Sequence, residues 1–337
     1  MKEAMLYKQL GENRVHCFLC SQHCHIDPGK IGKCGVRENR DGRLWSLVYG
    51  QLIAQNIDPI EKKPLFHYYP GTESFSVATA GCNFTCRFCQ NSDISQKPRE
   101  EGRIFGISVS PESLAERAQK AGCATIAYTY TEPTIFMEYA LDIASLAAEK
   151  GLANVFVSNG YMTREALEAA APLLGAANVD LKAFTDNFYK EQCGARLKPV
   201  LATLEGMKQK GIWLEVTTLL IPGLNDSESE LRELARFLAN LGKEIPWHIS
   251  RFYPTYLMTD RGPTSVEKVR RAREIGLEEG LHYVYTGNVP GDSGENTYCH
   301  SCGVVLIERV GYSIKKRNLE KGACAKCGTV LEGVGIE

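Results

Sequence analysis

Hydrophobic residues between positions 74 and 290 fall into short, β-branched runs that alternate with longer stretches of helical periodicity. The short runs predict seven strands, at residues 74–82, 124–130, 153–159, 177–182, 213–221, 248–253 and 282–286. Helix starts with a capping residue or an early proline lie between these runs, at residues 110–112, 131–133 and 227–230. Strands that alternate with helices of about 10–20 residues predict βα units around a parallel sheet, either open or curled into a barrel.

The two ends of the chain lack this alternation. Residues 1–70 carry four cysteines and several Gly/Pro turns, and residues 299–337 carry another four cysteines after a polar, Gly-rich link at 291–298. We therefore expect three parts: a Cys-rich N-terminal region at 1–70, a core of catalytic size at 71–290, and a small C-terminal unit at 291–337.

Composition and charge narrow the class of protein. The 337 residues are 44% hydrophobic and 23% charged, which excludes a disordered or fibrous chain. Lys and Arg number 39 against 40 Asp and Glu, so the whole chain has no electrostatic attraction for nucleic acid or for an anionic membrane. No run of about 18 apolar residues is present. We expect a soluble, cytoplasmic protein with no membrane partner and no nucleic-acid partner.

Three of the thirteen cysteines, Cys82, Cys86 and Cys89, form a C-x3-C-x2-C motif directly after the first predicted core strand. Three thiolates on one loop do not complete a structural zinc site. They can hold three irons of a [4Fe–4S] cluster and leave the fourth iron open to a small molecule. The carboxyl ends of parallel strands are also where α/β proteins place their chemistry. The alternative to a cluster is that these three are core or coincidental cysteines that bind no common ligand.

With Phe88 as its aromatic residue, this motif resembles the C-x3-C-x-aromatic-C signature of the radical SAM enzymes. The resemblance implies a partial (β/α)6 barrel, in agreement with the predicted order of strands and helices. It also implies an open iron that binds the amino and carboxylate groups of S-adenosylmethionine (SAM). Reductive cleavage then gives methionine and a 5′-deoxyadenosyl radical. An electron donor such as flavodoxin or ferredoxin is implied as a partner.

Later strand ends extend the resemblance. Glu132 and Pro133 stand where the family has Gly-Gly-Glu-Pro, although the two glycines are absent; Ser158-Asn159-Gly160 and Asp180-Leu181-Lys182 are similar to segments of glycyl-radical activating enzymes. Ser158 and Asp180 would lie near the SAM carboxylate, around a monovalent cation. Glu132 would accept the SAM ammonium, which needs such an acceptor. In full, the resemblance assigns cofactor contacts to Phe88, Thr131, Glu132, Ser158, Asn159, Asp180, Lys182 and His248.

The order of motifs along the chain is more specific. An N-terminal C-x2-C-x3-C ahead of TYTEPT, SNGYMT, DLKAF and IPGLND resembles the radical SAM component of the AmmeMemoRadiSam system, which is pyruvate formate-lyase activating enzyme-like. This implies Memo-like or AMMECR1-like partners and leaves the substrate open. The substrate is a backbone glycine, as in a glycyl-radical enzyme activase, another protein residue, or a small molecule.

Two further cysteine quartets flank the core. Cys299, Cys302, Cys324 and Cys327 form paired C-x-x-C-G motifs 21 residues apart, the pattern of a zinc ribbon, with an iron site as the alternative. The N-terminal quartet consists of Cys17, Cys20, Cys24 and Cys34. It suits zinc or a second [4Fe–4S] cluster, with His16, His23 and His25 as alternative ligands. We slightly favour zinc there, and expect Cys123 and Cys193 to be buried or incidental.

A second class of function remains open on the sequence alone. The chain could be a non-catalytic, zinc-stapled module that binds protein or RNA, with the central motif vestigial. The near-neutral charge gives this alternative no support. Metal content separates the two hypotheses: about four irons at the central motif indicate the enzyme, and zinc without iron indicates the binding module.

Overall fold

A computed structural model describes residues 1–336, and its centre is an eight-stranded sheet in the order β16-β15-β14-β13-β12-β11-β9-β8. Seven strands run parallel, and β8 pairs antiparallel at one edge. The sheet strands are β8 (Ala54–Pro59), β9 (Glu73–Ala78), β11 (Thr125–Tyr128), β12 (Ala153–Ser158), β13 (Ala176–Asp180), β14 (Trp213–Leu220), β15 (Trp247–Arg251) and β16 (Val284–Gly287).

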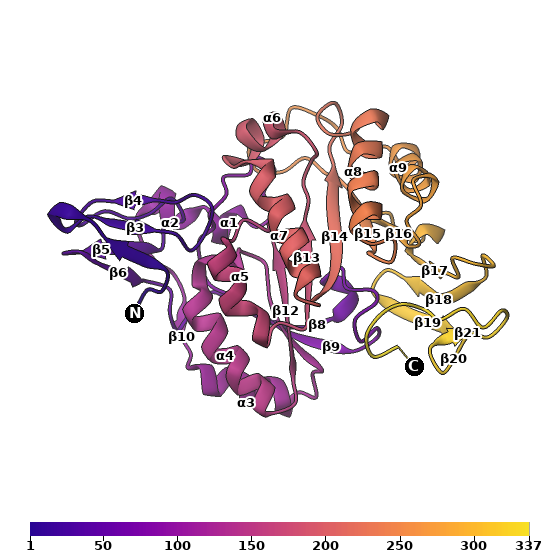
Figure 1. Cartoon of the computed structure of the whole chain (residues 1–337), viewed down its shortest axis with the longest axis horizontal. Helices are drawn as coiled ribbons and strands as arrows, with labels where there is room; N and C mark the ends of the chain where they lie inside the picture. Colours follow the sequence, from indigo (N-terminus) through magenta and orange to yellow (C-terminus); the bar gives the residue numbers. More distant parts are fainter. Residues whose placement is uncertain (337) are drawn as a thin grey trace.

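Helices connect consecutive parallel strands and cover one face of the sheet, as Figure 1 shows for α4, α5, α7 and α8. The helices are α1 (Ser92–Ser95), α2 (Lys97–Glu101), α3 (Pro111–Lys120), α4 (Met137–Glu149), α5 (Arg164–Ala170), α6 (Asp186–Phe188), α7 (Leu197–Gln209), α8 (Glu228–Leu241) and α9 (Val266–Glu278). Short capping side chains start several of them: the hydroxyl of Ser110 accepts from the amide of Ser113, and Ser227 does the same for Glu230.

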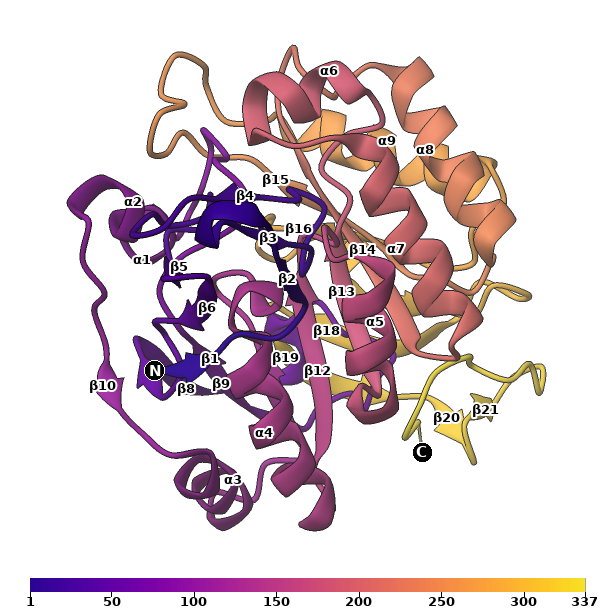
Figure 2. The same ribbon diagram turned by 60° about the vertical axis from the view of Figure 1, so that its left-hand side comes forward.

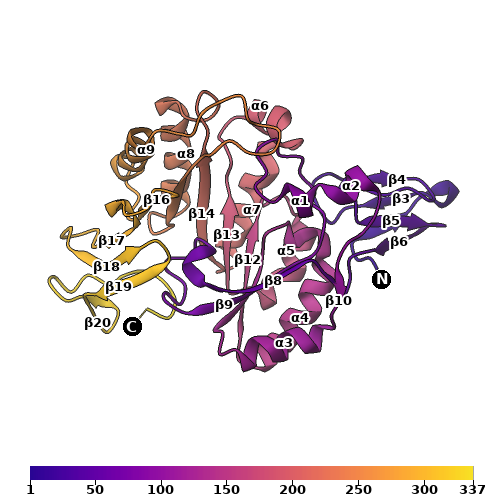
Figure 3. The same ribbon diagram turned by 180° about the vertical axis from the view of Figure 1, so that it is seen from behind.

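The opposite face of the sheet is covered in part by the segment between β8 and β9. Glu215, on β14, accepts the backbone amides of Phe66 and His67 at 3.0 and 2.8 Å, and Asn178 donates to the carbonyl of Pro64 at 2.8 Å. Figure 3, from behind, shows β8 and this segment in front of the parallel strands. Buried polar side chains therefore hold the segment to the sheet, since backbone groups that are buried away from water need other hydrogen-bond partners.

The N-terminal region forms small sheets at one end of the molecule (Figure 1). Its strands are β1 (Lys2–Glu3), β2 (Tyr7–Gln9), β3 (Val15–Cys17), β4 (His25–Ile26), β5 (Arg37–Arg40), β6 (Arg43–Ser46) and β7 (Gln51–Leu52), the last paired with β10 (Ile107–Ser108). A buried ion pair ties the region to α4: Arg37 Nη2 lies 2.8 Å from Glu138 Oε1, and both side chains are under 5% exposed.

The C-terminal unit lies at the other end of the molecule. Its strands are β17 (Thr297–Tyr298), β18 (Val305–Val310), β19 (Ser313–Arg317), β20 (Leu319–Glu320) and β21 (Ala323–Cys324). Arg309 reaches from β18 into the core, where it donates to the carbonyl of Phe66 at 3.0 Å and to the Thr297 hydroxyl at 2.7 Å.

The predicted α/β fold, a partial (β/α)6 barrel, is confirmed. Each of the seven predicted strands is present and is one to three residues shorter than predicted, and six of them are followed by a helix before the next parallel strand. The division at residues 70 and 290 stays a prediction; β8, from the segment 1–70, adds a strand to the main sheet. In the part of the chain that the structure describes, none of the helices combines the length and apolarity needed to cross a membrane.

Candidate functional site

The C-x3-C-x2-C segment forms a loop at the carboxyl end of β9. Gly81 begins it with φ of 101°, and a Cβ there would stand 2.5 Å from a methyl of Val36 and 2.9 Å from the carbonyl oxygen of Cys34. The loop is fixed from its other side by the segment Tyr189–Cys193, because the amide of Thr85 donates to the carbonyl of Cys193 at 2.9 Å. Backbone contacts on both sides thus position the three cysteines before any ligand is bound.

The three thiols have the environment of metal ligands. Burial raises the pKa of the Cys82 and Cys89 thiols above the ordinary value, so thiolates there need a positive partner. Cys82 Sγ accepts from the amide of Phe84 at 3.4 Å, and Cys89 Sγ lies 3.2 Å from the hydroxyl of Ser95. Among the described residues, the three sulfurs do not all lie within 4.8 Å of one another, which is too wide for one ion. The donor set therefore fits a cluster of several metal ions better than a single ion.

Glu132 joins the ends of β11 and β12 beside this loop. It is 2% exposed, and its Oε1 accepts from the hydroxyls of Thr134 and Ser158 at 2.5 and 2.8 Å. Its Oε2 accepts the backbone amide of Asn159 at 2.7 Å. Desolvation raises the pKa of this carboxyl, and these hydrogen bonds oppose the rise. The structure thus brings Glu132, Ser158 and Asn159 together, and their contacts with SAM stay predictions.

Asn159 links this carboxylate to the cysteine loop. Its Nδ2 donates to Asn83 Oδ1 at 2.7 Å and lies 3.8 Å from Cys82 Sγ, while its Oδ1 accepts the amide of Tyr161 at 3.1 Å. Because Asn159 contacts both groups, a substitution of Glu132 would displace Asn159 and with it the side-chain amide beside Cys82 Sγ. Thr131 makes a second link, since its hydroxyl donates to the carbonyl of Thr79 at 2.8 Å.

Asp180 and Lys182 form an ion pair at the end of β13. Lys182 Nζ lies 2.9 Å from Asp180 Oδ2 and 5.7 Å from the ring centre of Phe88. Burial opposes the charged form of Lys182, but the Asp180 carboxylate and the thiolate forms of Cys86 and Cys193 outweigh it and raise the pKa of the ammonium. The pair places an ammonium and a carboxylate, with no net charge between them, beside the cysteine loop. The predicted cation contact of Asp180 and the cofactor contacts of Lys182 and Phe88 stay predictions.

His248 lies apart from the group around Glu132. Strand register aligns it with Asp180 across β14, but its Nε2 bonds Glu215 Oε2 at 2.7 Å. The rings of Phe66 and Tyr285 lie 4.7 and 5.1 Å from its own ring centre. His248 is thus part of the buried network under the segment between β8 and β9, and its contact with a SAM adenine stays a prediction.

Two contributors to the site were not predicted from the sequence. The thiol of Cys193 hydrogen bonds with that of Cys86, which together with burial raises the pKa of Cys86. Tyr130 stands at the first glycine position of the family motif with φ of 61°, and Asp58 accepts its hydroxyl at 2.5 Å. A non-glycine residue in that region is strained, so the contact with Asp58 holds Tyr130 where glycine would fit freely.

The C-terminal quartet has a different and tighter geometry. The four sulfurs of Cys299, Cys302, Cys324 and Cys327 all lie within 4.8 Å of one another, with Cys299–Cys327 at 3.6 Å and Cys302–Cys324 at 3.7 Å. Tetrahedral zinc–thiolate bonds of about 2.3 Å put the sulfurs about 3.8 Å apart. Positive φ at Gly303 and Gly328 allows the turns that the paired motifs predicted. The spacing fits one tetrahedral ion.

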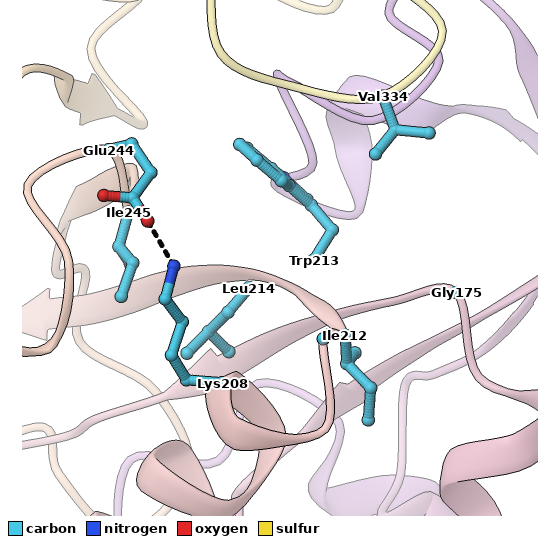
Figure 4. A pocket seen from close by; sticks show the side chains of 9 residues that line it. Gly175, Lys208, Ile212, Trp213, Leu214, Glu244, Ile245 and Val334 are labelled. Atoms are coloured by element: carbon cyan, nitrogen blue, oxygen red, sulfur yellow. Dashed lines mark hydrogen bonds and ion pairs between the residues drawn. The ribbon is translucent and has the colours of Figure 1, made fainter.

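A pocket in Figure 4 lies away from the candidate site. It is lined by Trp213 and Leu214 at the start of β14, by Val334, and by an ion pair between Lys208 and Glu244. These positions are at the amino ends of the parallel strands, opposite the cysteine loop, so the pocket contributes nothing to the site described above.

Comparisons with known proteins agree with this geometry. Residues 76–238 match the family model of the Radical SAM superfamily. The chain is 46% identical to the uncharacterized protein MJ0808 of Methanocaldococcus jannaschii, over 98% of this chain and 99% of the relative. It is 23% identical to the pyruvate formate-lyase-activating enzyme of Streptococcus mutans, over 60% and 83%.

Among solved structures, a radical SAM methyltransferase from Sphaerobacter thermophilus shares the fold. The TM-score is 0.52 at 20% sequence identity, over 65% of this chain and 67% of that one. The family match, the cysteine loop at the carboxyl end of β9 and the shared fold lead to one conclusion: the chain belongs to the radical SAM superfamily.

Proposed function

We propose that the protein cleaves SAM reductively with a [4Fe–4S] cluster held by Cys82, Cys86 and Cys89, and uses the resulting 5′-deoxyadenosyl radical to abstract hydrogen from a substrate. The observation that carries this proposal is the cysteine loop at the carboxyl end of β9, in hydrogen-bond contact with Asn159 and, through it, with Glu132. When bound, the cluster supplies the electron and the open iron that this chemistry requires.

The chain's own residues have positioning and electrostatic roles. Three thiolates would hold three irons, and the Asn159 amide would donate toward the sulfur of Cys82, which tunes a metal–thiolate bond. The Asp180–Lys182 pair supplies a carboxylate and an ammonium beside Cys86 and Phe88. These charges complement the carboxylate and ammonium groups of SAM. A monovalent cation beside Asp180 would replace Lys182 as its partner.

The substrate class is a separate question. Relatives named as activating enzymes support a protein glycine as one candidate. In that case the protein would generate a persistent glycyl radical on a partner, seen as a doublet in its EPR spectrum. We favour an unspecified substrate, which includes another protein residue or a small molecule, because similarity in SAM-binding motifs does not define the hydrogen donor. A ferredoxin or flavodoxin is the proposed reductant, and Memo-like or AMMECR1-like proteins are proposed partners.

An EPR titration tests the proposed open iron. In the reduced, iron-loaded protein, addition of SAM should change the spectrum of the cluster at Cys82, Cys86 and Cys89. The change should be absent from the Cys86→Ala variant and present in Cys123→Ala, a buried cysteine just before the amino end of β11. A wild-type spectrum that SAM leaves unchanged would contradict the proposal.

A further inference from the structure

The N-terminal quartet surrounds a cavity. Cys17, Cys20, Cys24 and Cys34 all line it, together with apolar side chains such as Ile26 and Ile135. We propose that these four thiolates hold a second, fully ligated [4Fe–4S] cluster and not a zinc ion. This assignment does not depend on the proposed function of the central motif.

The spacing of the sulfurs carries the proposal. Among the residues that the structure describes, no three of the four N-terminal sulfurs lie mutually within 4.8 Å, whereas all four C-terminal sulfurs do. One zinc ion would hold its thiolates about 3.8 Å apart. A cube of irons and sulfides sets its thiolates farther apart, because the cube stands between them. The N-terminal quartet therefore shares the wide spacing of the Cys82 loop and differs from the C-terminal quartet.

Hydrogen-bond donors around the cavity suit thiolate and sulfide sulfurs. Backbone amides of Gln22, Lys33 and Val36 donate to the sulfurs of Cys20, Cys24 and Cys34. Arg37 also lines the cavity and is 2% exposed. Within the described chain, its Nε is buried without a hydrogen-bond partner. A sulfur of the cluster would accept from Nε, since cluster sulfurs are common acceptors of such N–H groups.

The three histidines offered by the sequence are not part of this cavity. His16, His23 and His25 pack against one another, with the ring of His16 4.8 Å from that of His25 and 5.5 Å from that of His23. His23 and His25 are exposed. All four irons would thus be bound by thiolates, and no open position would remain for SAM or a substrate. The chemistry of such a cluster is limited to the gain and loss of one electron.

The cavity lies next to the cysteine loop, so the Cys82 cluster would be the acceptor of that electron. The carbonyl of Cys34 packs against Gly81, next to Cys82, and the side-chain Nε2 of Gln22 donates to the carbonyl of Asn83 at 2.9 Å. Figures 1 and 2 both place β3 and β4 beside α1 and α2, which follow the cysteine loop. A reduced iron–sulfur or flavin protein would give one electron to the N-terminal cluster. That cluster would pass the same electron to the Cys82 cluster, with no bond made or broken; this relay role, unlike the metal assignment, rests on the proposed function.

Metal counting tests the assignment without reference to activity. A variant that carries Cys82→Ser, Cys86→Ser and Cys89→Ser keeps the N-terminal quartet intact. After anaerobic reconstitution with iron, sulfide and zinc, it should hold about four irons, four sulfides and one zinc per chain, against about eight, eight and one in the wild type. Two zinc ions and no iron in the variant, with four irons and two zinc ions in the wild type, would overturn the assignment.

Two further measurements complete the test. Adding Cys20→Ser to the triple variant should remove the remaining iron and leave one zinc, whereas Cys123→Ser in its place should keep both metals. Retention of four irons after Cys20→Ser would contradict the assignment. For the relay, the EPR spectrum of the fully reduced wild type should be broadened by coupling between the two clusters. If this spectrum equals the sum of the spectra of the triple variant and of a variant with Cys20→Ser alone, the relay is contradicted and the metal assignment is not.

Discussion

Replacement of Glu132 by glutamine tests how the strand ends position the cysteine loop. The carboxylate is buried and accepts four hydrogen bonds, from the backbone amide and hydroxyl of Thr134, the Ser158 hydroxyl and the backbone amide of Asn159. In Glu132→Gln the size is kept, but an amide nitrogen must occupy one oxygen position. There it faces a backbone N–H, either that of Asn159 or that of Thr134.

The cost follows from this mismatch. A buried donor left without its acceptor destabilises by about 1–3 kcal/mol, and hydrogen bonds to a charged group are worth more than neutral ones. We expect Glu132→Gln to lower the free energy of unfolding by about 2–3 kcal/mol. Since Asn159 also donates toward Cys82 and Asn83, its displacement should weaken SAM binding while the iron content stays the same.

Anaerobic urea unfolding of the metal-loaded protein, with SAM binding measured in parallel, checks both effects. Glu149→Gln is the matched control, because Glu149 is exposed at the end of α4 and such changes are usually within about 0.5 kcal/mol. Our account would be refuted by a Glu132→Gln variant that unfolds within about 0.5 kcal/mol of wild type and binds SAM equally well.

Three further predictions follow from other parts of the structure. Glu138→Gln removes the carboxylate that pairs with the buried Arg37 guanidinium and should cost about 3–5 kcal/mol in urea unfolding, whereas Glu168→Gln, in an exposed pair with Arg164, should cost under about 1 kcal/mol. Burial lowers the pKa of His67 from 6.5 to about 4, so its neutral form stabilises the fold above pH 6.5 and this contribution, about 3 kcal/mol, is lost as the pH falls toward 4. The stability difference between wild type and His67→Gln should therefore shrink over that range, and a difference independent of pH would contradict the shift. Cys302→Ser should lose one zinc per chain with no change in iron by elemental analysis, and a loss of iron instead would contradict the zinc assignment.

Much of the fold could be predicted from local pattern. The parallel strands are short runs of apolar residues bounded by caps and turns, and such patterns depend on neighbours in the sequence. β8 was missed because it is an edge strand with exposed polar residues, such as Gln55 and Asn56, and it pairs only once β9 is in place.

The candidate site was predictable where a motif defines it and not where tertiary contacts do. Cys82, Cys86 and Cys89 stand out through spacing on one loop. Cys193, far along the chain, reaches Cys86 only through the fold. The same limit applies to the N-terminal quartet. Zinc and a [4Fe–4S] cluster both use four thiolates, and the sequence does not give the distances between the four sulfurs that would distinguish them.

Formation of 5′-deoxyadenosine tests the central claim most directly. Anaerobic protein reconstituted with iron and sulfide would receive dithionite and SAM, and the product would be quantified beside Cys86→Ala and Cys123→Ala. We predict product from the wild type and from Cys123→Ala, and none from Cys86→Ala. Equal product from Cys86→Ala, or none from fully iron-loaded wild type, would contradict the assignment of radical SAM chemistry to the Cys82 loop.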